Sequence, residues 1–128
     1  AHKDQLVLSF VGDGGFMMSG QELATAAQYG ATPIVLLFNN GIYGTIRMHQ
    51  ERDHPERISG TTLINQDFCK MAEGYGAHAE RVTKTADFAA AFDRARASGR
   101  PALIELVTNP EQISTRTTIT KLRDAAKK

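Results

Sequence analysis

The chain has 128 residues, of which 41% are hydrophobic and 23% are charged, and its formal net charge is +1. This balance suits one globular domain with one core, and it argues against nucleic acid or a membrane surface as the partner. No apolar run approaches the ~20 residues that a membrane span needs. A single cysteine, Cys69, excludes an intrachain disulfide and fits a reducing, cytoplasmic location. No signal peptide is visible, and because the chain begins at Ala1 and not at a methionine, we expect a fragment or a processed chain.

Apolar runs alternate with helical patterns along the chain, which predicts an α/β fold with a parallel sheet flanked by helices. The run over residues 6–11 is almost continuously apolar, as expected of a parallel strand buried on both faces. The other predicted strands are residues 34–38, 79–82 and 102–107. Glycine and proline residues break the chain between these runs, so each strand has a defined end.

Capping residues predict where the helices begin and end. Ser19 and Glu22 form a capping box, which predicts a helix from residue 19 to residue 29 with Gly30 at its C-terminal cap. Asp67 and Thr85 are expected to cap two further helices. The remaining expectations are a short helix after Tyr43, a polar loop over residues 51–66, helix ends at Gly74 and Gly99, and a final helix over residues 120–126.

Two polar turns follow the first two predicted strands, Gly12-Asp13-Gly14-Gly15 and Asn39-Asn40-Gly41. Ligands of open parallel sheets bind outside the carboxyl ends of the strands, so Asp13 and Asn40 are candidates for one crevice. Carboxylate and amide oxygens suit magnesium, which takes only some of its six ligands from protein. Glycine lets backbone N–H groups approach phosphate, and the start of a helix attracts anions. These turns therefore predict a magnesium-bridged diphosphate site.

The Gly-Asp-Gly sequence and the double asparagine, in this strand-helix-strand context, resemble the cofactor motif of the thiamine diphosphate-dependent enzymes. The surrounding sequence is similar to the branch of acetolactate synthase, benzoylformate decarboxylase and pyruvate oxidase. The resemblance covers nearly the whole chain and is strongest over residues 6–50. It implies that residues 1–128 are the diphosphate- and magnesium-binding domain of such an enzyme, without the N-terminal portion of that domain.

The resemblance also implies a set of ligands. The metal would be held by the Asp13 carboxylate, the Asn40 side-chain oxygen and the Ile42 main-chain carbonyl, with two diphosphate oxygens and a water. The other residues implied to contact the cofactor are Gly12, Gly14, Gly15, Phe16, Tyr43 and Gly44, and Met17 is expected to line the same wall. Asn39 either shapes the turn or takes a direct part.

Enzymes of this family decarboxylate a 2-oxo acid, and some join the product to a second carbonyl compound. The glutamate that activates the cofactor lies on a separate pyrimidine-binding domain, usually of a neighbouring subunit. That domain cannot lie in this chain, because only twelve residues precede Asp13. The resemblance thus implies a homo-oligomeric parent enzyme, no catalytic residue in this chain and no turnover by the chain alone.

Several alternatives stay open. Acetolactate synthases carry Met and Trp in the helix after the double asparagine, whereas this chain has Thr45 and His49, so the acid is not identified. A Rossmann-type nucleotide binder would need glycine where Met17 stands. A non-catalytic remnant that uses its exposed apolar surface for association is the other alternative. Among the remaining side chains, Cys69 is expected to be a small buried hydrophobe, and Phe88 and Phe92 are expected in the core.

Overall fold

The chain divides into two compact units in a computed structural model that describes residues 5–127. The first unit comprises Ala1–Asn39 and Asn65–Val107, and the second comprises Asn40–Ile64 and Thr108–Lys128. The turn with the double asparagine is therefore the place where the chain passes from the first unit into the second. Among the described residues, no helix is both long enough and apolar enough to span a membrane.

A four-stranded parallel sheet forms the centre of the first unit. Its strands are β1 (Leu8–Gly12), β2 (Ile34–Asn39), β3 (His78–Val82) and β4 (Ala102–Val107), in the order β1-β2-β4-β3. The two inner strands, β2 and β4, are apolar and buried over most of their length, as parallel strands covered on both faces must be. The predicted parallel α/β sheet with flanking helices is confirmed, and β4 has the predicted bounds.

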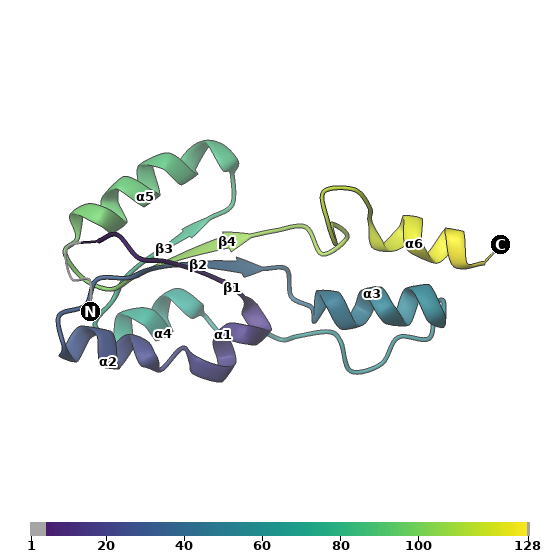
Figure 1. The fold of residues 1–128 in the computed structure, drawn as a ribbon, viewed down its shortest axis with the longest axis horizontal. Helices are drawn as coiled ribbons and strands as arrows, with labels where there is room; N and C mark the ends of the chain where they lie inside the picture. Colours follow the sequence, from purple (N-terminus) through teal and green to yellow (C-terminus); the bar gives the residue numbers. More distant parts are fainter. Residues whose placement is uncertain (1–4, 128) are drawn as a thin grey trace. The chain divides into compact units, whose positions relative to one another are not determined.

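Helices cover both faces of this sheet (Figure 1). The helices α1 (Asp13–Ser19), α2 (Glu22–Gln28) and α4 (Phe68–Gly74) lie on one face, and α5 (Phe88–Ala97) lies on the other. Strand side chains alternate between the faces, so β2 directs Val35 and Leu37 to the first core and Ile34 and Leu36 to the second. Phe16 and Phe68 join α1 to α4 in the first core through an edge-to-face contact with centroids 5.6 Å apart.

The first strand is less buried than its sequence predicts. Leu8 is 39% exposed and Phe10 is 67% exposed, although both belong to the apolar run expected to be buried on both faces. The reason is topological: within residues 5–127, β1 pairs only with β2 and forms an edge of the sheet. The run therefore predicted the strand correctly but not its position in the sheet.

The chain after β1 differs from the predicted glycine-rich turn. Gly12 has extended backbone angles and precedes α1, so Asp13 begins a helix rather than a loop. Ser19 ends that helix and cannot also take the extended conformation of an N-cap, so the predicted capping box is wrong. The second helix starts at Glu22 instead, after Gln21, and has no side-chain cap hydrogen bond.

The other helix signals agree more closely with the structure. Asp67 accepts a hydrogen bond from the Lys70 amide at 3.2 Å and caps α4 as predicted. The predicted Thr85 cap is wrong, because Thr85 lies in a 3₁₀ turn (Thr85–Asp87) and α5 starts at Phe88, two residues later than a cap at Thr85 would place it. Gly30 and Gly99 follow helix ends with positive φ angles of 64° and 63°, as C-terminal glycines do.

The second unit consists of α3 (Gly44–Asp53), α6 (Ile119–Ala126) and the segments beside them. The two helices contact each other and lie side by side in Figure 1. The expected polar loop starts later than predicted, because α3 continues to Asp53. Thr118 caps α6 by accepting from the Lys121 amide, so this helix starts one residue before the predicted position.

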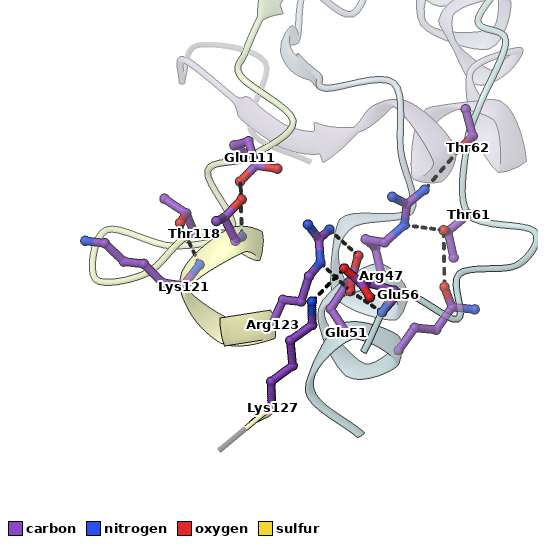
Figure 2. A network of polar contacts seen from close by, with 12 residues as sticks. Arg47, Glu51, Glu56, Thr61, Thr62, Glu111, Thr118, Lys121, Arg123 and Lys127 are labelled. Atoms are coloured by element: carbon purple, nitrogen blue, oxygen red, sulfur yellow. Dashed lines mark hydrogen bonds and ion pairs between the residues drawn. The ribbon is translucent and has the colours of Figure 1, made fainter. Parts of the chain in front are cut away.

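A buried ion pair joins these two helices (Figure 2). Glu51 of α3 is fully buried, and its carboxylate accepts from Arg123 Nε at 2.8 Å and Nη2 at 2.5 Å. The Glu56 amide donates to the same carboxylate at 3.0 Å. Hydrogen bonding by Arg123 lowers the pKa of Glu51 to about 2. This arrangement explains why Glu51 belongs to the helix and not to the loop that its charge suggested.

We expect Gly20→Ala to destabilise the first unit. A methyl group at this position would lie 2.6 Å from the Phe16 ring and 2.9 Å from the Phe16 carbonyl oxygen. Overpacking of this kind costs about 1–3 kcal/mol, measurable as a lower free energy of unfolding in urea. Gly74→Ala is the control, because no atom lies within 4 Å of the new methyl group. Equal stability of the two variants would contradict the packing described for Phe16.

We expect Arg123→Met to destabilise the second unit by about 3 kcal/mol, because it leaves a buried carboxylate unpaired. The folded pKa of Glu51 lies below its ordinary value of 4.5, so the pair stabilises the fold above that pH. This stabilisation should be lost as the pH falls toward 2.

Urea unfolding at several pH values measures both effects of Arg123→Met. Lys127→Met is the matched control, since Lys127 and Glu56 form an exposed pair at 2.6 Å that should contribute less than ~1 kcal/mol. A similar loss of stability in both variants would show that burial of Glu51 is not the cause.

Candidate functional site

Asp13 stands where β1 ends and α1 begins, and its carboxylate is buried. Only 3% of the residue is exposed. Oδ1 accepts from the Gly14 amide at 2.9 Å, and Oδ2 accepts from Asn65 Nδ2 at 2.7 Å. A buried carboxylate needs such donors, and its position in the first turn of a helix adds a favourable dipole. The side chain is therefore held in one orientation at the carboxyl end of the sheet.

Asn65 connects Asp13 to the end of the neighbouring strand. Its Nδ2 group also donates to Asn39 Oδ1 at 2.8 Å. This one amide group therefore joins Asp13, which follows β1, to Asn39, which ends β2. β1 and β2 are paired through Gly12 and Phe38, which brings their carboxyl ends together. Asn39 in turn donates from Nδ2 to Glu105 Oε1 at 2.7 Å. These contacts place Asn39 within the polar network of the first unit.

Glu105 is a buried carboxylate in the otherwise apolar strand β4. It is 1% exposed, and its Oε2 accepts from Arg81 Nε at 2.7 Å. The Cys69 thiol lies 3.6 Å from the same oxygen. Burial raises the pKa of Cys69 to about 11, and the negative charge of Glu105 adds to the rise. Hydrogen bonding to Glu105 raises the pKa of Arg81. Cys69 packs against the first core, as predicted, but it is only partly buried and its thiol lies beside a charged group.

The second unit presents Asn40 and Ile42 in a tight turn. Asn40 Oδ1 accepts from the Ile42 amide at 3.2 Å, and Gly41 between them has a φ of 70°, which favours glycine. Ile42 forms an isolated antiparallel bridge with Thr62. The backbone bonds of this bridge use the Gly41 carbonyl and the Tyr43 amide, rather than groups of Ile42.

Arg47 holds the bridged segment from the first turns of α3. Its Nε donates to Thr61 Oγ1 at 2.6 Å, and Nη2 donates to Thr62 Oγ1 at 3.0 Å. Figure 2 shows this side chain directed at both threonines.

A methyl group at Gly44 would lie 3.3 Å from Asn40 Nδ2, so a small residue suits this position. Asn40, Ile42, Tyr43 and Gly44 therefore belong to one rigidly bonded turn.

Some predicted site residues have other surroundings than expected. The Gly14 amide, expected to face phosphate, donates to Asp13 instead. Phe16 is 4% exposed and packs against Phe68 in the core, whereas Met17 is 49% exposed. His49 is exposed, and its Nδ1 lies 2.8 Å from Arg52 Nη2. Their expected roles toward a cofactor stay predictions.

Sequence reasoning missed Asn65 and Glu105. Asn65 lies in a stretch that was expected to be only a polar loop, and nothing in its immediate sequence distinguishes it. Glu105 did carry a signal, because a charge inside the apolar run over residues 102–107 requires a buried partner. That partner, Arg81, comes from β3, which pairs with β4 in parallel with Arg81 opposite Glu105.

A comparison with protein families identifies residues 1–106 as a match to the "Thiamine pyrophosphate enzyme, C-terminal TPP binding domain". The chain belongs to this family. Thiamine pyrophosphate is another name for thiamine diphosphate, so the family predicted from the Gly-Asp-Gly and double-asparagine motifs is confirmed. Family membership also favours this assignment over a Rossmann-type nucleotide binder.

Relatives of this thiamine diphosphate-binding domain have several different activities. A 3D-(3,5/4)-trihydroxycyclohexane-1,2-dione hydrolase of Bacillus velezensis is 36% identical over 121 residues, which are 89% of this chain and 19% of that protein. The acetolactate synthase large subunit of Corynebacterium glutamicum is 38% identical over 114 residues, 84% of this chain and 18% of that protein. The chain thus spans about a fifth of the length of the curated relatives it matches.

Solved structures agree with this family fold. A thiamine diphosphate-dependent 4-hydroxybenzoylformate decarboxylase of Rhodococcus jostii RHA1 matches with a TM-score of 0.77 and 35% identity, over 83% of this chain and 20% of that chain. The benzoylformate decarboxylase of Polynucleobacter necessarius has a TM-score of 0.78 at 24% identity, over 84% of this chain and 20% of that chain, and supports the fold alone.

We expect the Cys69 thiol to react slowly with iodoacetamide below pH 9, because its pKa is raised to about 11 and the thiolate is the nucleophile. Glu105→Gln removes a nearby negative charge and should lower this pKa, so alkylation at pH 9 should become several-fold faster. The rate is measured by mass spectrometry across a pH series. Glu73→Gln, at an exposed position of α4, is the control. An unchanged pH dependence in Glu105→Gln would show that burial, and not Glu105, raises the pKa of Cys69.

Proposed function

We propose that this chain is the diphosphate- and magnesium-binding domain of a thiamine diphosphate-dependent enzyme. The parent enzyme decarboxylates a 2-oxo acid and can join the product to a second carbonyl compound. The observation that carries the proposal is the buried Asp13 carboxylate of the Gly-Asp-Gly motif, held at the carboxyl end of β1 beside the strand that leads into the double asparagine. Ligands of open parallel sheets bind at this edge.

The donor atoms suit magnesium. Asp13 has carboxylate oxygens, and Asn40 and Ile42 have an amide oxygen and a main-chain carbonyl. Magnesium prefers such hard oxygen ligands and keeps the rest of its octahedron for phosphate and water. We therefore assign these three residues as its protein ligands.

The remaining predicted residues would hold the diphosphate through backbone groups. Gly12, Gly15, Tyr43 and Gly44 lie at the starts of α1 and α3, which follow β1 and β2 respectively. A methyl group at Gly15 would lie 3.2 Å from Val11 Cγ2, so only a residue without a side chain fits there easily. When bound, the cofactor supplies a thiazolium ring that accepts electrons as carbon dioxide leaves. The chain itself binds and orients the diphosphate end.

The activity of the parent needs parts that this chain does not supply. We propose that a pyrimidine-binding domain, from the same subunit or a neighbouring one, provides the activating glutamate, and that the parent is a cytoplasmic homo-oligomer. The chain's span of 19% of a curated relative is compatible with such a larger enzyme. No residue of this chain is assigned a catalytic role, and we expect the isolated chain not to turn over.

A second substrate class is suggested by the curated relatives. The hydrolases that are 36% identical over 121 residues act, by their name, on a cyclic 1,2-dione. In addition, Thr45 and His49 depart from the acetolactate synthase pattern in the helix after the double asparagine. Assays of the parent enzyme should therefore include cyclic diones beside pyruvate and aryl 2-oxo acids.

We expect Asp13→Ala to weaken the binding of thiamine diphosphate in the presence of magnesium by at least about 100-fold, since loss of a metal ligand costs more than loss of its supporting contacts. Isothermal titration of the full-length protein, with and without magnesium, measures the affinity. Asp93→Ala, an exposed change on α5, should bind like the unmodified protein. Magnesium-independent binding, or equal affinity in both variants, would refute the assignment.

A further inference from the structure

Five polar side chains form one continuous chain of contacts at the carboxyl end of the sheet. It runs from Asp13 through Asn65, Asn39 and Glu105 to Arg81, with distances of 2.7, 2.8, 2.7 and 2.7 Å between successive donor and acceptor atoms. All five residues belong to the first unit. This series of contacts begins at the Asp13 carboxylate, which is assigned to the metal, and ends at Arg81 of β3.

The charges at the two ends determine how each amide is oriented. Glu105 accepts only, so Asn39 must present its Nδ2 group to Glu105 and its Oδ1 atom to Asn65. Asn65 then faces two acceptors, Asn39 Oδ1 and Asp13 Oδ2, and only its NH₂ group can satisfy both. Reversal of either asparagine would place oxygen against oxygen. The network therefore has a single arrangement, in which Asn65 donates to Asp13.

The segment that carries Asn65 is itself anchored. Two residues further on, Asp67 caps α4 and accepts from Arg81 Nη2 at 3.3 Å. The same arginine donates from Nε to Glu105, so Arg81 holds both the loop end and the buried carboxylate. The contacts of Asp67 and Arg81 with α4, β3 and β4 therefore fix the segment from which Asn65 reaches Asp13.

We propose that Asn65 is a positioning residue for the Asp13 carboxylate, and that Asn39 and Glu105 orient Asn65. This inference rests on the proposed function, because it assigns Asp13 to the metal. Asn65 holds Oδ2 in place through one N–H while the Gly14 amide holds Oδ1. The two asparagines then have different roles. Asn39 supports the network at the end of the sheet, and Asn40 binds the metal.

The test compares Asn65→Leu with Gln66→Leu in the full-length protein saturated with thiamine diphosphate. Leucine has nearly the size of asparagine but cannot donate, and Gln66 is an exposed neighbour with the same chemical group. Magnesium affinity, measured by titration calorimetry, should fall about 10–100-fold in Asn65→Leu, as it does on loss of supporting contacts to metal ligands. Gln66→Leu should bind magnesium like the unmodified protein.

Two further measurements separate positioning from a structural effect. Asn65→Gln keeps the NH₂ donor and should recover part of the lost affinity, whereas a purely structural role predicts no such rescue. The melting temperature without cofactor should fall in Asn65→Leu, because buried Asp13 loses a donor, but both variants should stay folded at the temperature of the titration. Equal magnesium affinity in these two variants would overturn the positioning role while leaving the proposed function intact. Absence of magnesium-dependent binding by the unmodified protein would overturn both.

Discussion

The ion pair between the buried Glu105 carboxylate and the exposed Arg81 side chain is the constraint on which the carboxyl edge of the sheet depends. Glu105 is nearly inaccessible in a strand whose other buried residues are apolar, and such a charge is tolerated only with a partner and further hydrogen bonds. Arg81 supplies the partner from the adjacent strand, and Asn39 supplies a donor from the strand on the other side. Three strands are thereby linked near their carboxyl ends.

This pair belongs to a network whose contacts join residues far apart in the sequence. Asn39 donates to Glu105 across a separation of 66 residues, and Asn65 donates to Asp13 across 52. Among the described residues, no buried side-chain nitrogen or oxygen lacks a hydrogen-bond partner, which is the condition for such a network to stabilise rather than destabilise a fold.

The second unit uses the same physical solution with different residues. Glu51 is buried on α3 and is paired with Arg123 of α6, from which it is separated by 72 residues. The pair is supported by the Glu56 amide, while the exposed Lys127 pairs with Glu56 itself. In each unit a buried carboxylate with an arginine partner joins segments that the apolar core alone would leave less defined. This is a specific association rather than a large source of stability, because the cost of desolvating both charges offsets much of their attraction.

Local chemistry was enough to predict most strands, the Asp67 cap and the turn at Asn40, because strand patterns, caps and glycine turns depend on neighbouring residues. The Gly-Asp-Gly and double-asparagine motifs were likewise enough to identify the thiamine diphosphate family. Local sequence could not show that Ser19 ends one helix rather than caps the next, that β1 lies at an edge, or that Glu51 is buried. It also gave no sign of Asn65 beside Asp13. Only the tertiary structure decided these points, because each depends on a partner strand, a covering helix or an opposite charge brought close by folding and not by the order of residues in the chain.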